Sequence, residues 1–214
     1  MDVVKRLGEA MPEAHIELDY RTPLELLVAV ILSAQCTDRR VNLVTPALFQ
    51  RFPDARAYAS ASAAEVEPYI QTCGLYRAKA KNLVAAAKAL VLEHGGEVPR
   101  SREALEKLPG VGHKTAGVVS IHLGGDEAFP VDTHVKRLAF RLGFSRHTDP
   151  DKVEEDLQAL LPREHWMQGH QLLVWHGRRT CFARGPACER CSVAELCPRK
   201  GVRLKPGGGS RATP

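Results

Sequence analysis

The sequence predicts an all-α protein. Side-chain acceptors followed three residues later by an acid recur along the chain, apolar residues repeat at helical spacing, and no stretch shows sustained alternation of β-branched residues. The chain has 214 residues, of which 44% are hydrophobic and 26% charged, a composition that excludes wholesale disorder, collagen and a disulfide scaffold. This length allows one large domain or two small ones.

The composition also bears on location. The longest apolar stretch, Leu26 to Leu32, is far shorter than the roughly 20 residues that a membrane span needs, and the start MDVVKRLGEA lacks the apolar core of a signal peptide. We therefore expect a cytoplasmic protein with no membrane partner. Six cysteines in such a chain favour a metal site or catalysis over disulfides, and the net charge of +5 points only weakly to a polyanionic partner.

The first expected helix begins at Thr22-Pro-Leu-Glu25, which has the pattern of a capping box with proline at the first helical position. Apolar residues follow at i, i+3, i+4, i+7 and i+8, which predicts an amphipathic helix. They are Leu24, Leu27, Val28, Ile31 and Leu32.

Further helix starts recur along the chain. Ser62 and Thr148 are side-chain acceptors with an acid three residues on, and Ser101 precedes the helical sequence REALEKL. The Ala-rich run from Lys79 to Glu93 continues the helical period.

Two short helices are expected to meet at a glycine turn. Pro109 ends the helix that begins at Ser101, while Gly110 and Gly112 permit positive φ and close approach of another backbone. Lys114 lies at the start of the next helix, whose free N–H groups favour a bound phosphate. The plainer alternative is a glycine that only ends a helix.

These residues carry a resemblance to a known family. The segment LPGVGHKTAGVV resembles the helix-hairpin-helix motif of DNA glycosylases, and with the later VDTHV it is similar to the endonuclease III family. The resemblance extends from about Glu17 to Cys197 and implies two helical domains with a DNA groove between them. Residues 17–126 would form the six-helix domain with the hairpin, residues 1–16 and 127–204 a discontinuous iron-sulfur cluster domain, and residues 205–214 a flexible tail.

The resemblance implies a bifunctional DNA glycosylase and abasic-site lyase of base excision repair. Lys114 matches the nucleophile that attacks C1′ of an oxidised pyrimidine nucleotide, forms a Schiff base and permits cleavage 3′ to the abasic site by β-elimination. Because only the neutral amine attacks and a lysine pKa is ordinarily roughly 10.4, we expect burial and the helix N-terminus to favour neutral Lys114. Without the resemblance, a solvated lysine is the simpler interpretation.

Asp132 precedes Thr133-His-Val-Lys, so one interpretation is an N-cap. In the family the matching carboxylate lies opposite the lysine, where it stabilises positive charge on the sugar or relays protons. The two roles are compatible, because a cap would fix the carboxylate's orientation.

The implied partner is duplex DNA containing damaged bases or abasic sites, bound by a monomer. Gln35 and Leu75 match side chains that fill the gap left by a nucleotide rotated out of the stack, although Leu75 also fits a core leucine and Gln35 a loop amide. The family usually has a small apolar residue at Cys36, which bears on substrate preference. The expected DNA-binding residues are Gln35, Leu75, Gly110, Gly112, Thr115 and His134.

Four cysteines, Cys181, Cys188, Cys191 and Cys197, have six, two and five residues between them. By chemistry alone they suit tetrahedral zinc or an iron-sulfur cluster, and the resemblance implies a [4Fe-4S] cluster. Cys36 and Cys73 fall outside this pattern and are expected to be buried thiols.

Two other functions share part of the motif set of the lyase. A monofunctional adenine glycosylase lacks the lysine nucleophile, and a non-catalytic DNA-binding protein has no need of Lys114 and Asp132 together. Charge supports contact with DNA: residues 176–205 hold eight basic and two acidic residues, 8 − 2 = +6, which leaves 5 − 6 = −1 for the rest.

Overall fold

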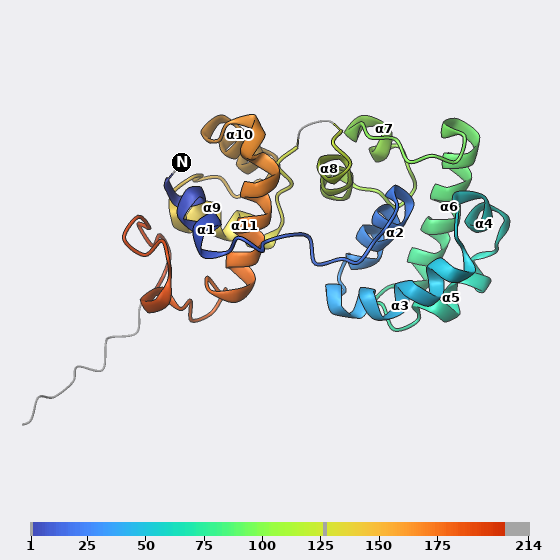
Figure 1. The fold of residues 1–214 in the computed structure, drawn as a ribbon, viewed down its shortest axis with the longest axis horizontal. Helices are drawn as coiled ribbons and strands as arrows, with labels where there is room; N and C mark the ends of the chain where they lie inside the picture. Colours follow the sequence, from blue (N-terminus) through green and yellow to red (C-terminus); the bar gives the residue numbers. More distant parts are fainter. Residues whose placement is uncertain (1, 126–127, 204–214) are drawn as a thin grey trace, which may run out of the picture. The chain divides into compact units, whose positions relative to one another are not determined.

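The computed structural model describes residues 2–125 and 128–203, and the regular structure of this part of the chain is entirely helical (Figure 1). The predicted all-α class is confirmed. The α-helices are α1 (Asp2–Ala10), α2 (Pro23–Ser33), α3 (Asp38–Arg51), α4 (Ala55–Ser60), α5 (Ala63–Ile70), α6 (Tyr76–His94), α7 (Arg102–Glu106), α8 (His113–His122), α9 (Thr133–Leu142), α10 (Pro150–Leu160) and α11 (Trp166–Arg179). The 3₁₀ helices are η1 (Arg163–His165) and η2 (Cys188–Arg190).

The chain divides into two compact units. One contains Ile16–Pro130, and the other combines Met1–His15 with Val131–Pro214. The first holds seven described α-helices, α2 to α8, where the resemblance implies six; α4 and α7 are the shortest of them. The expected tail, 205–214, lies outside the described residues. No described helix is long and apolar enough to cross a membrane.

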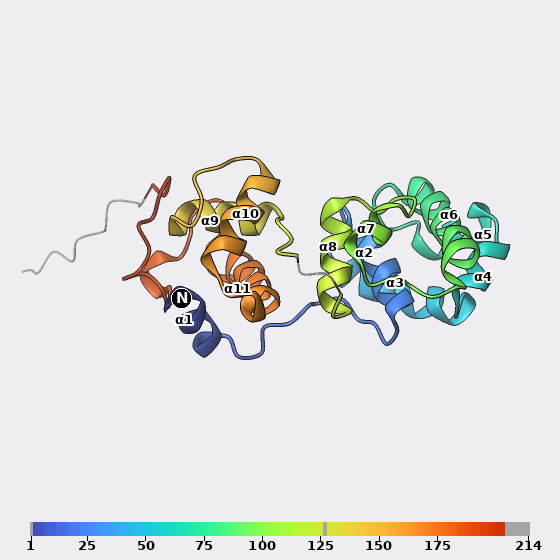
Figure 2. The same cartoon turned by 90° about the horizontal axis from the view of Figure 1, so that it is seen from above.

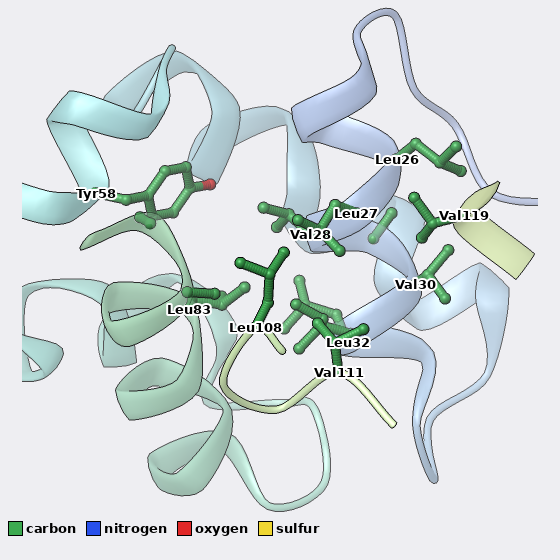
Figure 3. Packing of buried hydrophobic residues seen from close by; sticks show 14 of the residues in the cluster. Leu26, Leu27, Val28, Val30, Leu32, Tyr58, Leu83, Leu108, Val111 and Val119 are labelled. Carbon is green, nitrogen blue, oxygen red and sulfur yellow. The ribbon is translucent and has the colours of Figure 1, made fainter. Parts of the chain in front are cut away.

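The core of the Ile16–Pro130 unit is built around α2. Every residue from Leu26 to Leu32 is buried, so the prediction of an amphipathic helix is wrong: this helix is enclosed on all sides. It packs against α3, α6 and α8. Figure 3 shows Val119 of α8 beside Leu26 and Val30, with Val111 close to Leu32.

Side-chain caps set the helix starts in this unit, as the sequence predicts. Thr22 Oγ1 accepts from the N–H of Glu25 at 3.2 Å, whose carboxylate in turn accepts from the N–H of Arg21 at 2.6 Å. The Glu25 carboxylate therefore binds the N–H of the residue that precedes the N-cap Thr22, and not that of Thr22 itself. The N–H of Ser62 donates to Glu65 at 2.8 Å, and Ser101 Oγ accepts from the first turn of α7 at 3.1 Å.

The second unit packs α1 and α9 against α11, and Figures 1 and 2 show α1 beside α11. Trp175 of α11 donates its indole N–H to the carbonyl of His15 at 2.7 Å, which fastens the N-terminal segment to α11. The predicted cap at Thr148 is wrong. Asp149 caps α10 instead, because Pro150 occupies the first helical position and the residue before it is the cap.

The two glycines of the turn between α7 and α8, residues 107–112, differ in conformation. Gly110 has φ +79°, and a Cβ there would lie 2.6 Å from the Asn82 side chain. Gly112 has φ −88°, and a Cβ there would meet no atom within 4 Å. Gly110 therefore has both the positive φ and the close neighbour that the sequence led us to expect. Gly112 has neither within the protein.

We expect Gly110→Ala to lower the free energy of unfolding by about 1–3 kcal/mol, because the side chain is strained at positive φ and meets Asn82. Gly112→Ala is the comparison: without positive φ or a close neighbour it should lose only the smaller amount, less than about 1 kcal/mol, by which alanine is a poorer helix cap than glycine. Urea unfolding of both variants measures the difference. Equal losses would contradict this assignment.

Candidate active site and cysteine segment

Lys114 lies in the first turn of α8, two residues after the Gly112 cap, and its side chain is exposed. The burial expected from the sequence is therefore wrong for the protein without DNA. The start of α8 is held against the end of α7 by His113, whose Nδ1 lies 2.7 Å from Glu106 Oε1. Sequence reasoning missed this pair, because no motif marks it. Thr115, the next expected DNA contact, is half-buried.

Asp132 caps α9 in the other unit. One carboxylate oxygen accepts from the N–H groups of His134 and Val135, both at 2.8 Å. The predicted N-cap is thus confirmed, and it fixes the orientation of the half-buried carboxylate. Asp132 therefore stabilises the start of α9.

His134 lies between α9 and α11. Its Nδ1 is 3.2 Å from Arg137 Nη2, and a Cβ added at Gly177 would come within 3.0 Å of the His134 side chain. Burial is the main cause that lowers the pKa of this imidazole, while the Asp132 carboxylate opposes the shift. The neutral ring therefore packs against α11, and this contact accounts for the residue without DNA.

Gln35 and Leu75 belong to one unit and lie on neighbouring loops. The Gln35 loop, residues 34–37, connects α2 to α3, and the Leu75 loop, residues 71–75, connects α5 to α6. A Cβ at Gly74 would be 3.1 Å from the Gln35 carbonyl oxygen, so the two backbones are in contact. Both side chains are exposed, and both residues have left-handed backbones, with φ 52° and 57°. Such strain costs about 1–3 kcal/mol at each residue.

The four predicted ligands line a single cavity in the cysteine segment, residues 180–203, and each thiol is half-buried. They are Cys181, Cys188, Cys191 and Cys197. Leu138 and Val193 form apolar parts of the same wall. Across the described ranges, 2–125 and 128–203, no three His, Cys, Asp or Glu side chains gather closely enough to hold one metal ion.

Two arginines of α9, which sequence reasoning missed, hold the beginning of the cysteine segment. Arg141, 8% exposed, donates to the Phe182 carbonyl at 2.6 Å and the Cys181 sulfur at 3.3 Å. Arg137 donates to the Cys181 carbonyl at 3.0 Å and the Gly177 carbonyl at 2.9 Å. Their partners are mostly backbone carbonyls, which leave no trace in sequence spacing.

Two of the four sulfurs, those of Cys188 and Cys191, lie in a setting that disfavours the free thiolate. Burial raises the pKa of Cys191, and burial together with the Cys181 thiol raises that of Cys188. A metal would have to displace these protons to bind the sulfur. Burial lowers the pKa of His176 to about 4, so the imidazole, 3.4 Å from the Cys191 sulfur, is neutral at pH 7. The pocket therefore adds no imidazolium charge.

Of the other two cysteines, Cys73 is buried, at 2% exposure, as predicted. Cys36 is only half-buried, which corrects the expectation for that residue. It follows Gln35 directly in the loop, where part of its surface remains open.

The fold and the glycine turn have counterparts in known proteins. The family described as HhH-GPD superfamily base excision DNA repair protein matches residues 28–163, a range that contains the turn, Lys114 and Asp132. The match covers more than half of the chain. It defines the class as a helix-hairpin-helix protein of base excision DNA repair.

Relatives narrow this class. Endonuclease III of Synechocystis sp. is 50% identical over 198 residues, covering 92% of this chain and 90% of the relative. That of Escherichia coli is 41% identical over 200 residues, covering 94% and 95%. A solved structure of a trapped endonuclease III–DNA covalent intermediate, an estranged-adenine complex, has a TM-score of 0.87 at 43% identity and covers 92% of both chains.

This chain belongs to the endonuclease III family, as the sequence motifs predict. The family consists of two-domain helical DNA glycosylases with abasic-site lyase activity. DNA glycosylase and abasic-site lyase is therefore the enzyme class of this protein.

We expect Asp132→Ala to lower the free energy of unfolding by about 1 kcal/mol, because two N–H groups at the start of α9 lose their acceptor. Asp132→Asn keeps an acceptor oxygen and should lose much less. Urea unfolding of both variants checks the cap separately from any catalytic role. Equal stability of all three proteins would contradict it.

Proposed function

We propose that this enzyme removes oxidised pyrimidines from duplex DNA through a Schiff base on Lys114. The observation that carries the proposal is the position of Lys114: an exposed amine in the first turn of α8, directly after the glycine turn of a base excision repair fold. The covalent DNA intermediate of a structurally similar relative supports a nucleophile in this family.

The chemistry balances without an outside reagent other than water and protons. Neutral Lys114 Nζ attacks C1′, the bond from C1′ to the base breaks, and the base leaves with the electron pair and gains a proton. The sugar ring opens to a Schiff base between C1′ and Nζ, which acidifies the C2′ proton. Loss of that proton breaks the C3′–O bond, so the 3′ phosphate leaves, and water then releases Lys114 from the sugar.

Asp132 would act as the carboxylate of this reaction. The carboxylate can stabilise the positive charge that develops on the sugar, or it can relay protons. In the cap, Asp132 Oδ1 accepts both hydrogen bonds from the N–H groups of α9, at 2.8 Å each. These two bonds fix the plane of the carboxylate and therefore the direction of its second oxygen. A carboxylate that is already oriented need not move as the positive charge develops, so no free energy is lost to reorganisation during the reaction.

Duplex DNA is the proposed partner, because endonuclease III–DNA complexes are among the structurally similar proteins. Gln35 and Leu75 would enter the space left by the rotated nucleotide, and their exposure supports this role. The open surroundings of Gly112 would admit a phosphate near the N–H groups of α8, with Thr115 in the same turn. The His134 ring packs against Gly177 of α11, and its contact with DNA stays a prediction.

We propose that the two compact units are the six-helix and cluster domains, and that the cysteine segment holds a [4Fe-4S] cluster. Zinc needs four ligands within about 2.3 Å of one ion. Four thiols that line one cavity suit zinc as well as a cluster, and membership of the endonuclease III family supports the cluster. Donors from Arg141 and the Arg199 N–H lie 3.3 and 3.4 Å from Cys181 and Cys197, as suits thiolates. The cluster would tie the segment into one shape.

The Schiff base is tested by borohydride reduction with a duplex that contains thymine glycol. The wild-type enzyme should form a covalent complex with DNA, and Lys114→Ala should form none, because the reducible linkage is lost. Lys88→Ala, an exposed lysine of α6, is the control and should be trapped normally. Denaturing gels measure the complex.

Other outcomes of the trapping experiment are informative. Release of the base without trapping would identify a monofunctional glycosylase, and neither release nor trapping would leave a DNA-binding protein. Trapping that persists in Lys114→Ala would place the nucleophile elsewhere.

The cluster is tested by metal analysis. The purified protein should contain about four irons and four acid-labile sulfides per chain, and Cys188→Ser should lose most of both, because one ligand is removed. Cys36→Ser, outside the cavity, should keep them. Stoichiometric zinc in place of iron would overturn the proposal.

A further inference from the structure

Lys79 is a buried lysine that the proposed reaction does not use. It lies in the first turn of α6 with 4% of its surface exposed. Its ammonium donates to the carbonyl of Leu32 at 2.9 Å and to that of Ala34 at 2.7 Å. These carbonyls lie at the C-terminal end of α2, where a positive charge is favourable and the last carbonyls need donors.

Lys79 also reaches the second loop through its backbone. Its N–H donates to the carbonyl of Leu75 at 3.0 Å, the regular helical bond from residue i to i−4, which any residue except proline would make at this position. One residue therefore binds the Gln35 loop with its side chain and the Leu75 loop with its main chain. The two loops are in contact at Gly74, so the hydrogen bond of the Lys79 ammonium to Ala34 in the Gln35 loop bears on both loops.

The burial of a charge at this point is costly. Desolvation lowers the pKa of Lys79, while the thiols of Cys36 and Cys73 beside it oppose the shift. An apolar side chain would fill a core position without that cost. The charge instead satisfies two carbonyls next to a residue with φ 52°, a backbone that requires support from its surroundings.

We infer that Lys79 is a positioning residue for base excision, which holds Gln35 and Leu75 in one fixed arrangement so that both enter the DNA gap together. The inference rests on the proposed gap-filling role of these two residues. It assigns Lys79 no contact with DNA. Its effect passes through the two loops that carry the contacts.

The first experiment needs no DNA. Hydrogen exchange of residues 33–36 and 72–76 is compared in the wild type, Lys79→Met, Lys79→Arg and the control Lys88→Met, an exposed lysine on the same helix. Lys79→Met should exchange at least about tenfold faster in both loops, the factor expected when charge-assisted hydrogen bonds are lost. Lys79→Arg, which keeps the charge and the donors, should lose less, and Lys88→Met should match the wild type.

The second experiment measures function with a duplex that has 2-aminopurine opposite the lesion. Lys79→Met should show a smaller fluorescence rise on binding and slow single-turnover base release at least about tenfold. Its β-elimination at an abasic site in single-stranded DNA should stay near the wild-type rate, because no duplex gap has to be filled. Lys79→Arg should recover part of both losses.

The outcomes separate the inference from the function on which it rests. Unchanged loop exchange with unchanged base release in Lys79→Met would overturn the inference, and so would an equal fall of base release and single-stranded β-elimination, which indicates general damage. If the wild type released no damaged base at all, the proposed function would fail, while faster loop exchange would still support the tie between the loops.

Discussion

The burial of α2 is the constraint from which the rest of its unit follows. Seven consecutive residues, Leu26 to Leu32, lie out of contact with water, and a side chain of this size contributes about 1.5–3 kcal/mol when it is fully buried. A helix that is apolar on every face must be enclosed, so α3, α6 and α8 surround it. Leu108 and Val111 of the glycine turn belong to the same core, which places the start of α8, and hence Lys114, by packing.

The end of α2 creates the second requirement. Where the apolar run stops, the last carbonyls of the helix lose their helical partners, although that of Leu32 is buried and that of Ala34 is partly buried. The Lys79 ammonium supplies donors to two of them, and its backbone binds the Leu75 loop. The two exposed side chains are thus held through a helix end that has to be satisfied for the fold itself. The hydrogen bonds that satisfy the end of α2 thus also orient the two proposed DNA contacts, Gln35 and Leu75.

The sequence predicted those features whose cause is local. The caps at Thr22, Ser62 and Ser101 depend on residues within three positions, and they form as expected. Full enclosure of α2 was missed because helical periodicity alone describes one face. The role of Lys79 was missed because its partners are carbonyls 47 and 45 residues away, and a lysine in an Ala-rich helix resembles a surface residue. The family motif pointed to Lys114, whereas its burial was wrongly expected.

In the second unit, too, hydrogen bonds between residues far apart in the sequence connect one helix, α9, to the cysteine segment. Asp132 caps α9 and Arg137 belongs to that helix: the first holds a carboxylate at the helix start, and the second donates to the carbonyls of Gly177 and Cys181. Arg141, one turn further, holds the next residues of the cysteine segment. A change in the shape of that segment would therefore either break these hydrogen bonds or act on α9 through them. The proposed cluster would in this way stabilise the helix that Asp132 caps, and with it the orientation of the carboxylate that we propose takes part in the reaction.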